Sequence, residues 1–455
     1  MPLILGTNSI KDTGYNVDNS LRFNSAGPDD LSKTFGTATD TKKWTCSFWW
    51  KPAIAAAQQQ IFSVTNGTAD DTFFHIQYRD NVEIRLNGYN TNWLTTNRKF
   101  RDYSAWYHVV VSADSTQGTA ANRLKLYING TEETSFATDN RGSISEDQTW
   151  GINLAQPHFI GSEAGGGSGV SGYLSEFVMI DGLRLDPTSF GEFDSDSGIW
   201  KPINVSSLTF GNNGFYQEYK QAGTGTNSSG MGADTSGNGN HIAVSNLAAV
   251  DQSTDTCTNN FATLNPLSKV GSATFSNGNL TYTYVNDSGT AGTMGVTKGK
   301  WYWEYKFEGS ANVAVAGIVD ASIIPTTNIN NTGTAGYYPL GNSAWKDTTE
   351  VTTGLSGYSD GMIIGLAFDA DNGDIYTWVN GTAENSGSAI ITGLDTTKTW
   401  LPFTCTGTPT INLNFGSPPF AISSGNADGN GYGNFEYAVP SGYYALNTKN
   451  LAEFG

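Results

Sequence analysis

The chain has 455 residues, of which 54 are glycine and 12% are aromatic, and its formal net charge is −18 at pH 7. Because 42 acidic residues outnumber 24 basic ones, we expect the surface to repel phosphate backbones and anionic membranes, which disfavours nucleic-acid binding. The glycines and aromatics, without any long stretch of helical periodicity, favour short strands joined by turns.

Two further features bear on location and redox chemistry. The stretch MPLILGTNSI has no basic region and too short an apolar run for a signal peptide, and no segment approaches the roughly 20 apolar residues of a membrane span. We therefore expect synthesis in the cytoplasm without secretion or membrane insertion. Cys46, Cys257 and Cys405 lie far apart without a CxxC motif, which argues against a disulfide framework and a zinc site.

The first half of the chain contains several segments with the two-residue period of strands. In RLKLYI, Leu124, Leu126 and Ile128 fall on one face, whereas Arg123 and Lys125 fall on the other, as in a sheet with one buried face. The other predicted strands here are SLRFN (20–24), KWTCSFWWKP (43–52), AWYHVVVSAD (105–114) and GYLSEFVMIDG (172–182).

Turn residues dominate the middle of the chain, and strand signals resume after it. We interpret 191–265 as a turn-rich connector between a domain at 1–190 and another at 266–455. In KWYWEYKFE (300–308), four aromatic residues alternate with polar or tyrosine positions, which predicts the core face of a second sandwich. The remaining predicted strands are NLTYTYV, NVAVAGIVD, GMIIGLAFD, DIYTWVNG, TWLPFTC and TINLNFG.

Two octapeptides, LYINGTEE (126–133) and TWVNGTAE (377–384), almost repeat each other. Each follows an apolar strand that ends in Asp and a turn, and each ends a second strand in Asn-Gly. The pairs Asn129-Gly130 and Asn380-Gly381 supply the positive φ angles of a type I′ hairpin. The repeat therefore predicts the same strand pair in two sandwiches of related architecture.

The first half resembles laminin G-like domains of the concanavalin A-like jelly-roll class, through SLRFN, TCSFWWKP, QIFSV, AWYHVVVSAD, RLKLYING, FIGS (159–162) and GYLSEFVMIDG before LDPTSFGE. The second half resembles SPRY-type domains through GKWYWEYKFE, AGIVD, SDGMIIGLAFDADNGDIYTWVNGT, WLPFTC and INLNFGSPPF. The resemblance implies an all-β protein with two concanavalin A-like jelly-roll sandwiches.

The pairing of these modules, with PSGYYALNTKNL near the end, resembles structural proteins of tailed bacteriophages, especially marine ones. That resemblance implies a protein of the virion exterior that contacts other virion proteins, and a symmetric homo-oligomer such as a trimer. Three functions stay open: a tail-fibre or appendage adhesin that binds host surface glycan, a capsid decoration or appendage structural protein, and a glycan-cleaving enzyme. We expect the adhesin, without enzymatic activity.

Metal and catalytic motifs are incomplete in this sequence. Asp234 to His241 follows a calcium loop at positions 1, 3, 5 and 6, but Ser245 stands where a bidentate Glu is needed. The turn Asp369–Asp374 has Gly373 at a ligand position. Glu192-Phe-Asp194-Ser-Asp196-Ser197 approaches the Glu-x-Asp-x-x-Glu strand of glycan-cleaving enzymes but lacks its last carboxylate. We expect no cofactor, metal or catalytic residue.

Aromatic residues among amides in two predicted loops are candidates for sugar contact. One loop is NGYNTNW (87–93) and the other is the polar segment 326–348. A sugar ring docks on an exposed aromatic face flanked by amides, whereas the alternative is an aromatic folded back over a sandwich end. The candidate ligand-binding residues are Tyr89, Trp93, Tyr337, Tyr338 and Trp345.

Overall fold

The computed structural model describes residues 12–27, 29–65, 69, 72–283, 288–407 and 409–455. The chain is nearly all β and divides into an N-terminal unit, Thr13–Thr258, and a C-terminal unit that contains Asn259–Gly455. The predicted fold class is thereby confirmed. The prediction about MPLILGTNSI lies outside the described residues.

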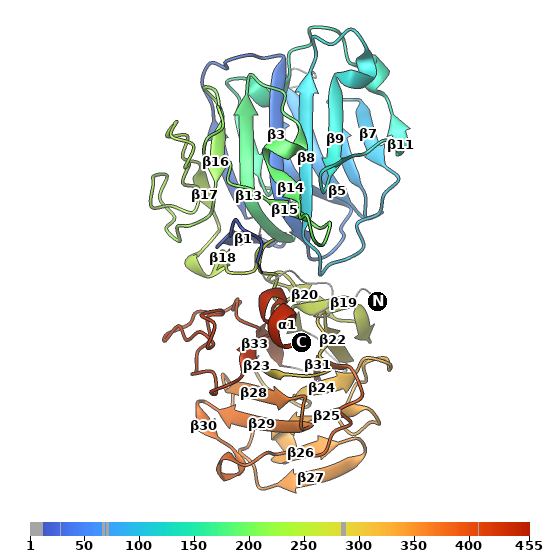
Figure 1. The fold of residues 1–455 in the computed structure, drawn as a ribbon, viewed down its shortest axis with the longest axis vertical. Coiled ribbons are helices and arrows are strands. Elements are labelled where there is room, and N and C mark those ends of the chain that lie inside the picture. The colour runs from blue at the N-terminus through green and yellow to red at the C-terminus, as the bar shows by residue number, and fades with distance from the viewer. Residues whose placement is uncertain (1–11, 28, 66–68, 70–71, 284–287, 408) are drawn as a thin grey trace. The chain divides into compact units, whose positions relative to one another are not determined.

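The N-terminal unit contains two eight-stranded antiparallel sheets, drawn one behind the other in Figure 1. The first sheet has the order β10 (Thr131–Glu132), β9 (Leu124–Ile128), β8 (Tyr107–Asp114), β3 (Lys43–Pro52), β13 (Gly172–Asp181), β1 (Ser20–Phe23) and β18 (Gln252–Ser253), with β16 (Phe215–Gln217) on β13. The second has the order β11 (Phe136–Asp139), β7 (Asn92–Thr96), β6 (Ile84–Asn87), β5 (Phe73–Arg79), β4 (Gln58–Thr65), β12 (Pro157–Ile160), β2 (Asp30–Thr34) and β17 (Ala243–Ser245).

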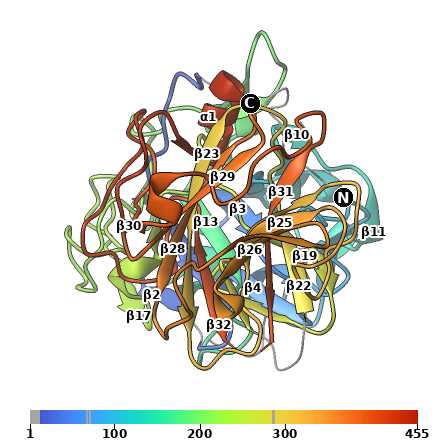
Figure 2. The ribbon, with the colours of Figure 1, turned by 90° about the horizontal axis from the view of Figure 1, so that it is seen from below.

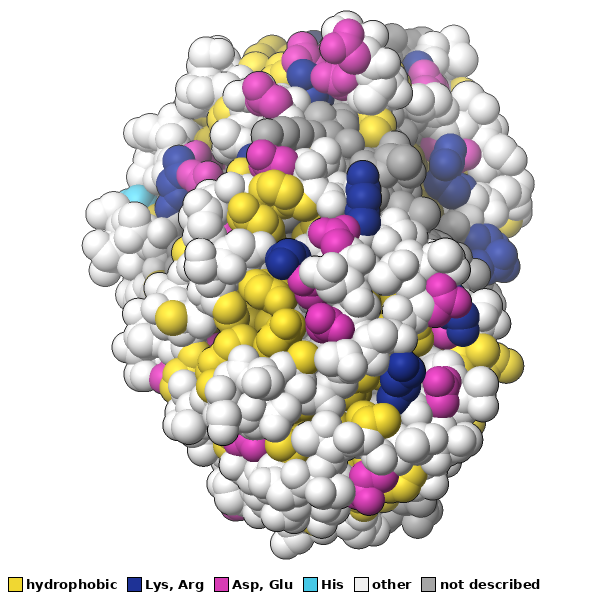
Figure 3. Space-filling model, turned by 60° about the horizontal axis from the view of Figure 1, so that its bottom comes forward, with side chains coloured by type: hydrophobic (Ala, Val, Ile, Leu, Met, Phe, Trp, Pro, Cys, Tyr) yellow, Lys and Arg dark blue, Asp and Glu magenta, His cyan; other side chains and the backbone are white. Residues whose placement is uncertain are grey.

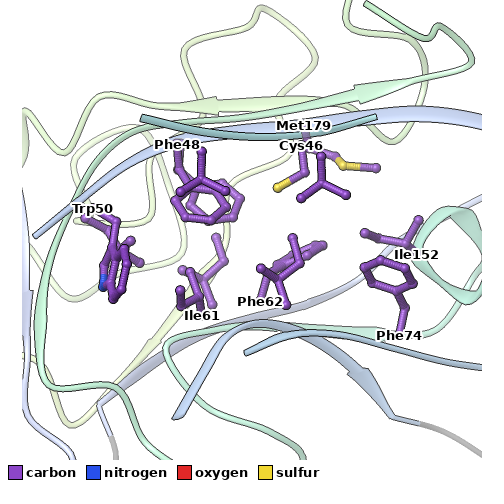
Figure 4. Packing of buried hydrophobic residues seen from close by; sticks show 14 of the residues in the cluster. Cys46, Phe48, Trp50, Ile61, Phe62, Phe74, Ile152 and Met179 are labelled. Carbon is purple, nitrogen blue, oxygen red and sulfur yellow. The ribbon is translucent and has the colours of Figure 1, made fainter. Parts of the chain in front are cut away.

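The core of this unit lies between the two sheets, because alternate residues of each strand point inward. In Figure 4, Cys46, Phe48 and Met179 approach from one sheet and meet Phe62 and Phe74 from the other. All five side chains are buried, so their burial supplies the hydrophobic free energy that holds the sheets together.

The predicted connector 191–265 is wrong as a linker, because residues 191–258 belong to the N-terminal unit. They supply β16, β17 and β18, which extend both sheets, and the hairpin of β14 (Gly191–Phe193) and β15 (Trp200–Pro202). Phe210 and Tyr216 from this segment pack on Val110 and Val178, on the face of the first sheet that points away from the core. Their burial explains why so turn-rich a segment is part of the sandwich.

The C-terminal unit again contains two sheets. One has the order β19 (Leu264–Val270), β22 (Ser288–Gly292), β31 (Trp400–Thr406), β24 (Ala316–Asp320), β25 (Thr334–Tyr338), β26 (Ser343–Lys346) and β27 (Thr349–Thr353). The other has the order β20 (Thr274–Ser276), β21 (Thr281–Thr283), β32 (Thr410–Asn414), β23 (Lys300–Glu308), β28 (Ile363–Asp369), β29 (Asp374–Val379) and β30 (Thr382–Ala383), with β33 (Tyr444–Ala445) parallel to β23. Figure 2 views this unit along another axis.

Helical structure is short in both units. The α-helix α1, Thr448–Phe454, begins at Asn447, whose side chain accepts a hydrogen bond from the Asn450 N–H. Single 3₁₀ turns cover Ala120–Asn122, Arg141–Ser143, Gly151–Asn153, Pro187–Ser189, Ala249–Asp251, Pro339–Gly341 and Asn385–Gly387.

Strand β23 carries the predicted aromatic row, and Trp301, Trp303, Tyr305 and Phe307 are all buried. Its opposite face also contains buried residues, Tyr302 and Glu304. Phe435 and Ala445 of the C-terminal segment pack on Tyr302, and the Glu304 carboxylate accepts hydrogen bonds from the Glu436 and Tyr437 N–H groups at 3.0 and 2.9 Å. The C-terminal segment therefore covers a face that strand alternation alone predicts to be wet.

Candidate functional site

The second sheet of the N-terminal unit has a polar face, which points away from the core. In β5, Phe74, Ile76 and Tyr78 point into the core, so His75, Gln77 and Arg79 lie on the opposite side. Strands β4, β6 and β7 contribute to the same side. The polar face consists of Gln60, Ser63, His75, Gln77, Arg79, Arg85, Asn87 and Thr95.

Strand register arranges these side chains in rows across the sheet. Gln60 pairs with Gln77, Gln77 with Arg85, and Arg85 with Thr95, which forms one continuous row over four strands. In the neighbouring row, Ser63 pairs with His75 and His75 with Asn87. Directly paired residues lie about 4.5–5.5 Å apart at Cβ, so the rows form a flat array of amide, guanidinium, imidazole and hydroxyl groups.

His75 is held as a neutral imidazole. Its Nδ1 lies 3.3 Å from the Gln77 side-chain N–H₂, and its Nε2 lies 2.7 Å from the Thr65 hydroxyl. Since the amide donates to Nδ1, the ring proton is on Nε2 and points to Thr65. Burial lowers the pKa of His75 to about 4, so this residue is a fixed, uncharged part of the face at neutral pH.

Four buried side-chain atoms on this face lack a hydrogen-bond partner: Gln60 Oε1, Gln77 Oε1, Arg79 Nε and Arg85 Nε. The other ends of these groups are anchored. The Gln60 N–H₂ donates to Glu163 at 3.3 Å, and Arg79 donates to the Gln58 amide oxygen at 3.2 Å. An unpaired buried polar atom costs about 1–3 kcal/mol. Gln60 and Gln77 are themselves buried, at 0% and 3% exposed, whereas Arg79 and Arg85 are half-buried, so the arginine end of the polar face is the part that a polar ligand can reach.

An aromatic edge borders the polar face. The rings of Phe73 and His75 stack at 4.0 Å, and the Tyr89 ring meets Phe73 edge-on at 6.0 Å. Phe73 and Tyr89 are half-buried, so part of each ring is open to solvent. Tyr89 therefore lies beside polar groups, as its candidate role in sugar contact requires.

Trp93 and Tyr337 were expected in exposed loops, and this expectation is wrong. Trp93 lies in β7, is 1% exposed, and packs against Phe74 and Trp150 in the core. Tyr337 lies in β25, is fully buried, and its hydroxyl donates to the Ser356 carbonyl oxygen. Both rings fill the interior of a sandwich, so neither has a face available to a ligand.

Tyr338 and Trp345 lie on one face of the β25–β26 pair in the C-terminal unit. Tyr338 pairs with Ser343, and the Trp345 indole N–H donates to the Ser343 hydroxyl at 3.0 Å. Both rings are half-buried against the apolar cluster that contains Val319 and Leu401. They belong to a different unit from Tyr89, so the five candidate residues do not form one site.

The two metal-like loops use their carboxylates internally. Asp234 accepts hydrogen bonds from the N–H groups of Tyr216, Ser236 and Asn240. Asp369 pairs with Lys300 at 2.8 Å and accepts from the Asn372 N–H. In the described part of the chain, no group of three or more His, Cys, Asp or Glu side chains could hold a metal ion.

A Ser–His pair lies on the first sheet of the N-terminal unit. Ser47 Oγ is 2.8 Å from His108 Nε2, the distance expected of a nucleophile and its base. However, the Trp200 indole N–H donates to His108 Nδ1 at 2.9 Å, which places the ring proton on Nε2. Burial also lowers the pKa of His108 to about 3. His108 therefore donates to Ser47 and cannot accept its proton.

Apart from Asn87, which belongs to the predicted loop 87–93, the residues of the polar face were absent from the predicted site. The signal was present in FFHIQYR (73–79), where His75, Gln77 and Arg79 alternate with core residues. Polar alternation of this kind is typical of any half-buried strand. Only the pairing of β4 to β7 brings the polar positions together.

Comparisons with known proteins address the fold of the chain. Residues 25–186 match the family model of the Concanavalin A-like lectin/glucanases superfamily. The match covers the core strands of the N-terminal unit, including β4 to β7 and the whole polar face. A comparison with curated protein sequences finds no match.

Solved structures with similarity to this chain include SPRY domains. The SPRY domain of human HERC1 is 16% identical, with a TM-score of 0.29, over 33% of this chain and 96% of its own. The TRIM65 PSpry domain is 15% identical, with a TM-score of 0.28, over 33% of this chain and 89% of its own. A Bacteroides ovatus protein described as carbohydrate-binding is 13% identical, with a TM-score of 0.34, over 51% of this chain and 58% of its own.

Within the described residues, no helix is long and apolar enough to cross a membrane.

Proposed function

We propose that the N-terminal unit binds carbohydrate on its polar face. The proposal is supported by two half-buried guanidinium groups, Arg79 and Arg85, on the same face as the half-buried rings of Phe73 and Tyr89. Sugar hydroxyl oxygens accept hydrogen bonds, so the half-buried guanidinium groups of the polar face are suitable donors for them. The family description, which includes lectins, is consistent with this role.

Tyr89 and Phe73 supply the apolar part of the proposed site. The C–H groups of a sugar ring pack on an aromatic face while its hydroxyls reach neighbouring polar groups. The half-buried rings at one border of the polar face therefore favour a sugar over a purely polar ligand such as a free ion. Tyr338 and Trp345 remain candidates for a separate contact in the C-terminal unit.

A glycan array with the full chain and the Gln77→Ala variant tests the proposed site. Gln77 pairs directly with Arg85, and its amide also orients His75, so we expect binding to fall about tenfold or more. Asn129→Ala, on the other sheet, is the matched control with unchanged binding. Equal binding by Gln77→Ala and the unaltered chain would remove the polar face as the site.

We propose binding without cleavage. Amide, imidazole and guanidinium groups dominate the polar face, whereas glycoside hydrolysis needs two carboxylates facing one bond. A reducing-end assay with any polysaccharide that binds tests this point, and the expected result is no release of new ends. A steady release that Gln77→Ala abolishes would assign catalysis to this face.

We further propose that the protein is an adhesin of the virion exterior, as its sequence resemblance to phage structural proteins implies. Antibody labelling of purified particles tests the location. Label at distal appendages supports the adhesin, whereas label over the whole capsid supports the alternative of a decoration or structural protein.

A further inference from the structure

Arg79 and Arg85 are neighbours on the polar face. The Arg79 backbone N–H donates to the Glu83 carbonyl oxygen at 3.1 Å, and Gln77 pairs with Arg85. The two arginines therefore occupy diagonal positions across β5 and β6. Burial lowers the pKa of Arg85, and the nearby charge of Arg79 lowers it further, which indicates electrostatic repulsion between the two guanidinium groups. Two guanidinium groups at diagonal positions of a sheet repel each other unless an anion lies between or beside them.

The surrounding carboxylates are largely committed to other partners. Glu83 forms its shorter ion pair with Lys99, at 2.7 Å, and a longer one with Arg85, at 3.7 Å. Asp80 caps its own turn by accepting the Asn81 N–H, and it acts on Arg85 only through space. Glu163, at the far end of the row, accepts from Gln60 and Ser168.

Arg79 is the more unusual of the two arginines. Its hydrogen bond in the described structure goes to the neutral Gln58 amide, at 3.2 Å, and its Nε has no partner. Many other cations of the chain pair closely with acids, as in Lys51–Asp255 at 2.7 Å and Arg98–Glu133 at 2.6 Å. The face in Figure 3 likewise has most of its blue groups beside magenta ones. Arg79 belongs with the cations that bond to neutral oxygens, such as Lys346 and Arg184, so no ion pair among the described residues neutralises its charge.

From this pair we infer that the glycan is acidic, and that a carboxylate or sulfate group on the sugar binds at Arg79 and Arg85. The inference rests on the proposed carbohydrate site. A planar guanidinium donates two parallel hydrogen bonds to such an oxyanion. Because the chain carries −18 overall, general attraction of polyanions does not explain such binding.

Matched pairs of polysaccharides test the inference with the full chain. Polygalacturonate is compared with its methyl ester, which removes the carboxylate charge, and dextran sulfate is compared with dextran. We expect at least tenfold tighter binding to one acidic member than to its neutral partner, and weaker binding as salt rises. The pair that responds identifies the carboxylate or the sulfate as the bound group.

Variants connect the effect to the two arginines. Arg79→Gln and Arg85→Gln should each weaken acidic binding about tenfold while thermal unfolding stays near that of the unaltered chain. Arg79→Lys keeps the charge but loses the planar fork, so we expect an intermediate affinity. Arg184→Gln is the matched control, because Arg184 contacts Tyr127 on the other sheet, and it should bind normally.

Other results would contradict the acidic preference or the carbohydrate site itself. Equal binding to acidic and neutral partners, or acidic binding that Arg79→Gln and Arg85→Gln leave unchanged, would overturn the inference. If neutral dextran binds and Gln77→Ala abolishes that binding, the carbohydrate site stands and only its acidic preference fails. Failure of all four polysaccharides to bind would count against both.

Discussion

At the scale of single residues, burial separates the aromatic candidates into scaffold and surface. Sequence composition marks Tyr89 and Trp93 equally, because both sit among amides in one short stretch. The register of β6 and β7 turns Trp93 into the core and leaves Tyr89 half-buried beside Phe73. The β6–β7 register shifts between the Leu86–Leu94 and Asn87–Asn92 pairs, and this irregularity places Trp93 in the core, whereas Tyr89 lies in the turn between the strands.

Alanine substitution should lower stability at Trp93 and glycan binding at Tyr89. Trp93→Ala removes a buried indole, so we expect the free energy of unfolding of the N-terminal unit to fall by about 3–5 kcal/mol. Tyr89→Ala should cost about 1 kcal/mol or less but weaken glycan binding. Denaturant unfolding and glycan titration of both variants measure this. A stable Trp93→Ala protein that has lost only binding would contradict the placement of Trp93.

Glu176 gives a prediction about pH. It sits at a bulge in β13, and burial raises its pKa from 4.5 to about 7, while Tyr216 donates to its carboxylate. Ionisation of Glu176 therefore costs stability above pH 7, and this cost disappears as pH falls to 4.5. Glu176→Gln should raise the free energy of unfolding by about 1–3 kcal/mol at pH 8 and change it little at pH 4.5. Unfolding curves at the two pH values measure the difference, which a pH-independent change would contradict.

At the scale of elements, the Asn-Gly repeat is the same turn in both units. Asn129 and Gly130 have φ angles of 48° and 77°, and Asn380 and Gly381 have 48° and 79°. Asn129 Oδ1 accepts from the His108 N–H at 2.8 Å, and Asn380 Oδ1 accepts from the Ile363 N–H at 2.9 Å. The predicted type I′ hairpins are confirmed, and each asparagine also ties its turn to the preceding strand.

Substitution in these turns should destabilise each unit by a similar amount. Asn129→Ala and Asn380→Ala lose one hydrogen bond and place alanine at positive φ, so we expect a cost of about 1–3 kcal/mol in each case. Gly130→Ala should cost more, because its Cβ would lie 2.3 Å from the Trp200 ring. Thermal unfolding of the three variants tests this order. A Gly130→Ala variant as stable as Asn129→Ala would contradict the packing of Trp200 on the turn.

Strand periodicity and turn chemistry predicted most elements of both sandwiches, because each acts over a few neighbouring residues. The extent of each sandwich was not predictable in this way. Residues 191–258 contain mostly turn residues, yet Phe210 and Tyr216 are buried in the N-terminal unit. The face of β23 with Glu304 is covered by Phe435, more than a hundred residues away. Long-range packing of this kind leaves no local pattern.

At the scale of the whole molecule, the chain consists of two separately cored units. Each unit has its own pair of sheets and its own buried hydrophobic residues, so each meets the physical requirement for folding alone. We expect fragments 13–258 and 259–455 to give cooperative unfolding transitions, with glycan binding confined to the first. A fragment 1–190, cut at the predicted boundary, should not fold, because it lacks β16, β17 and β18. Circular dichroism of the three fragments checks this, and a cooperative 1–190 fragment would contradict the revised boundary.

The most direct test of a carbohydrate site on the polar face is a crystal structure of the full chain with the oligosaccharide that binds best. We predict a sugar over strands β4 to β7, with oxygen atoms within hydrogen-bond distance of the Arg79 and Arg85 guanidinium groups and a ring near Tyr89. A sugar bound elsewhere, for instance at Tyr338 and Trp345, with the polar face free of ligand, would contradict it.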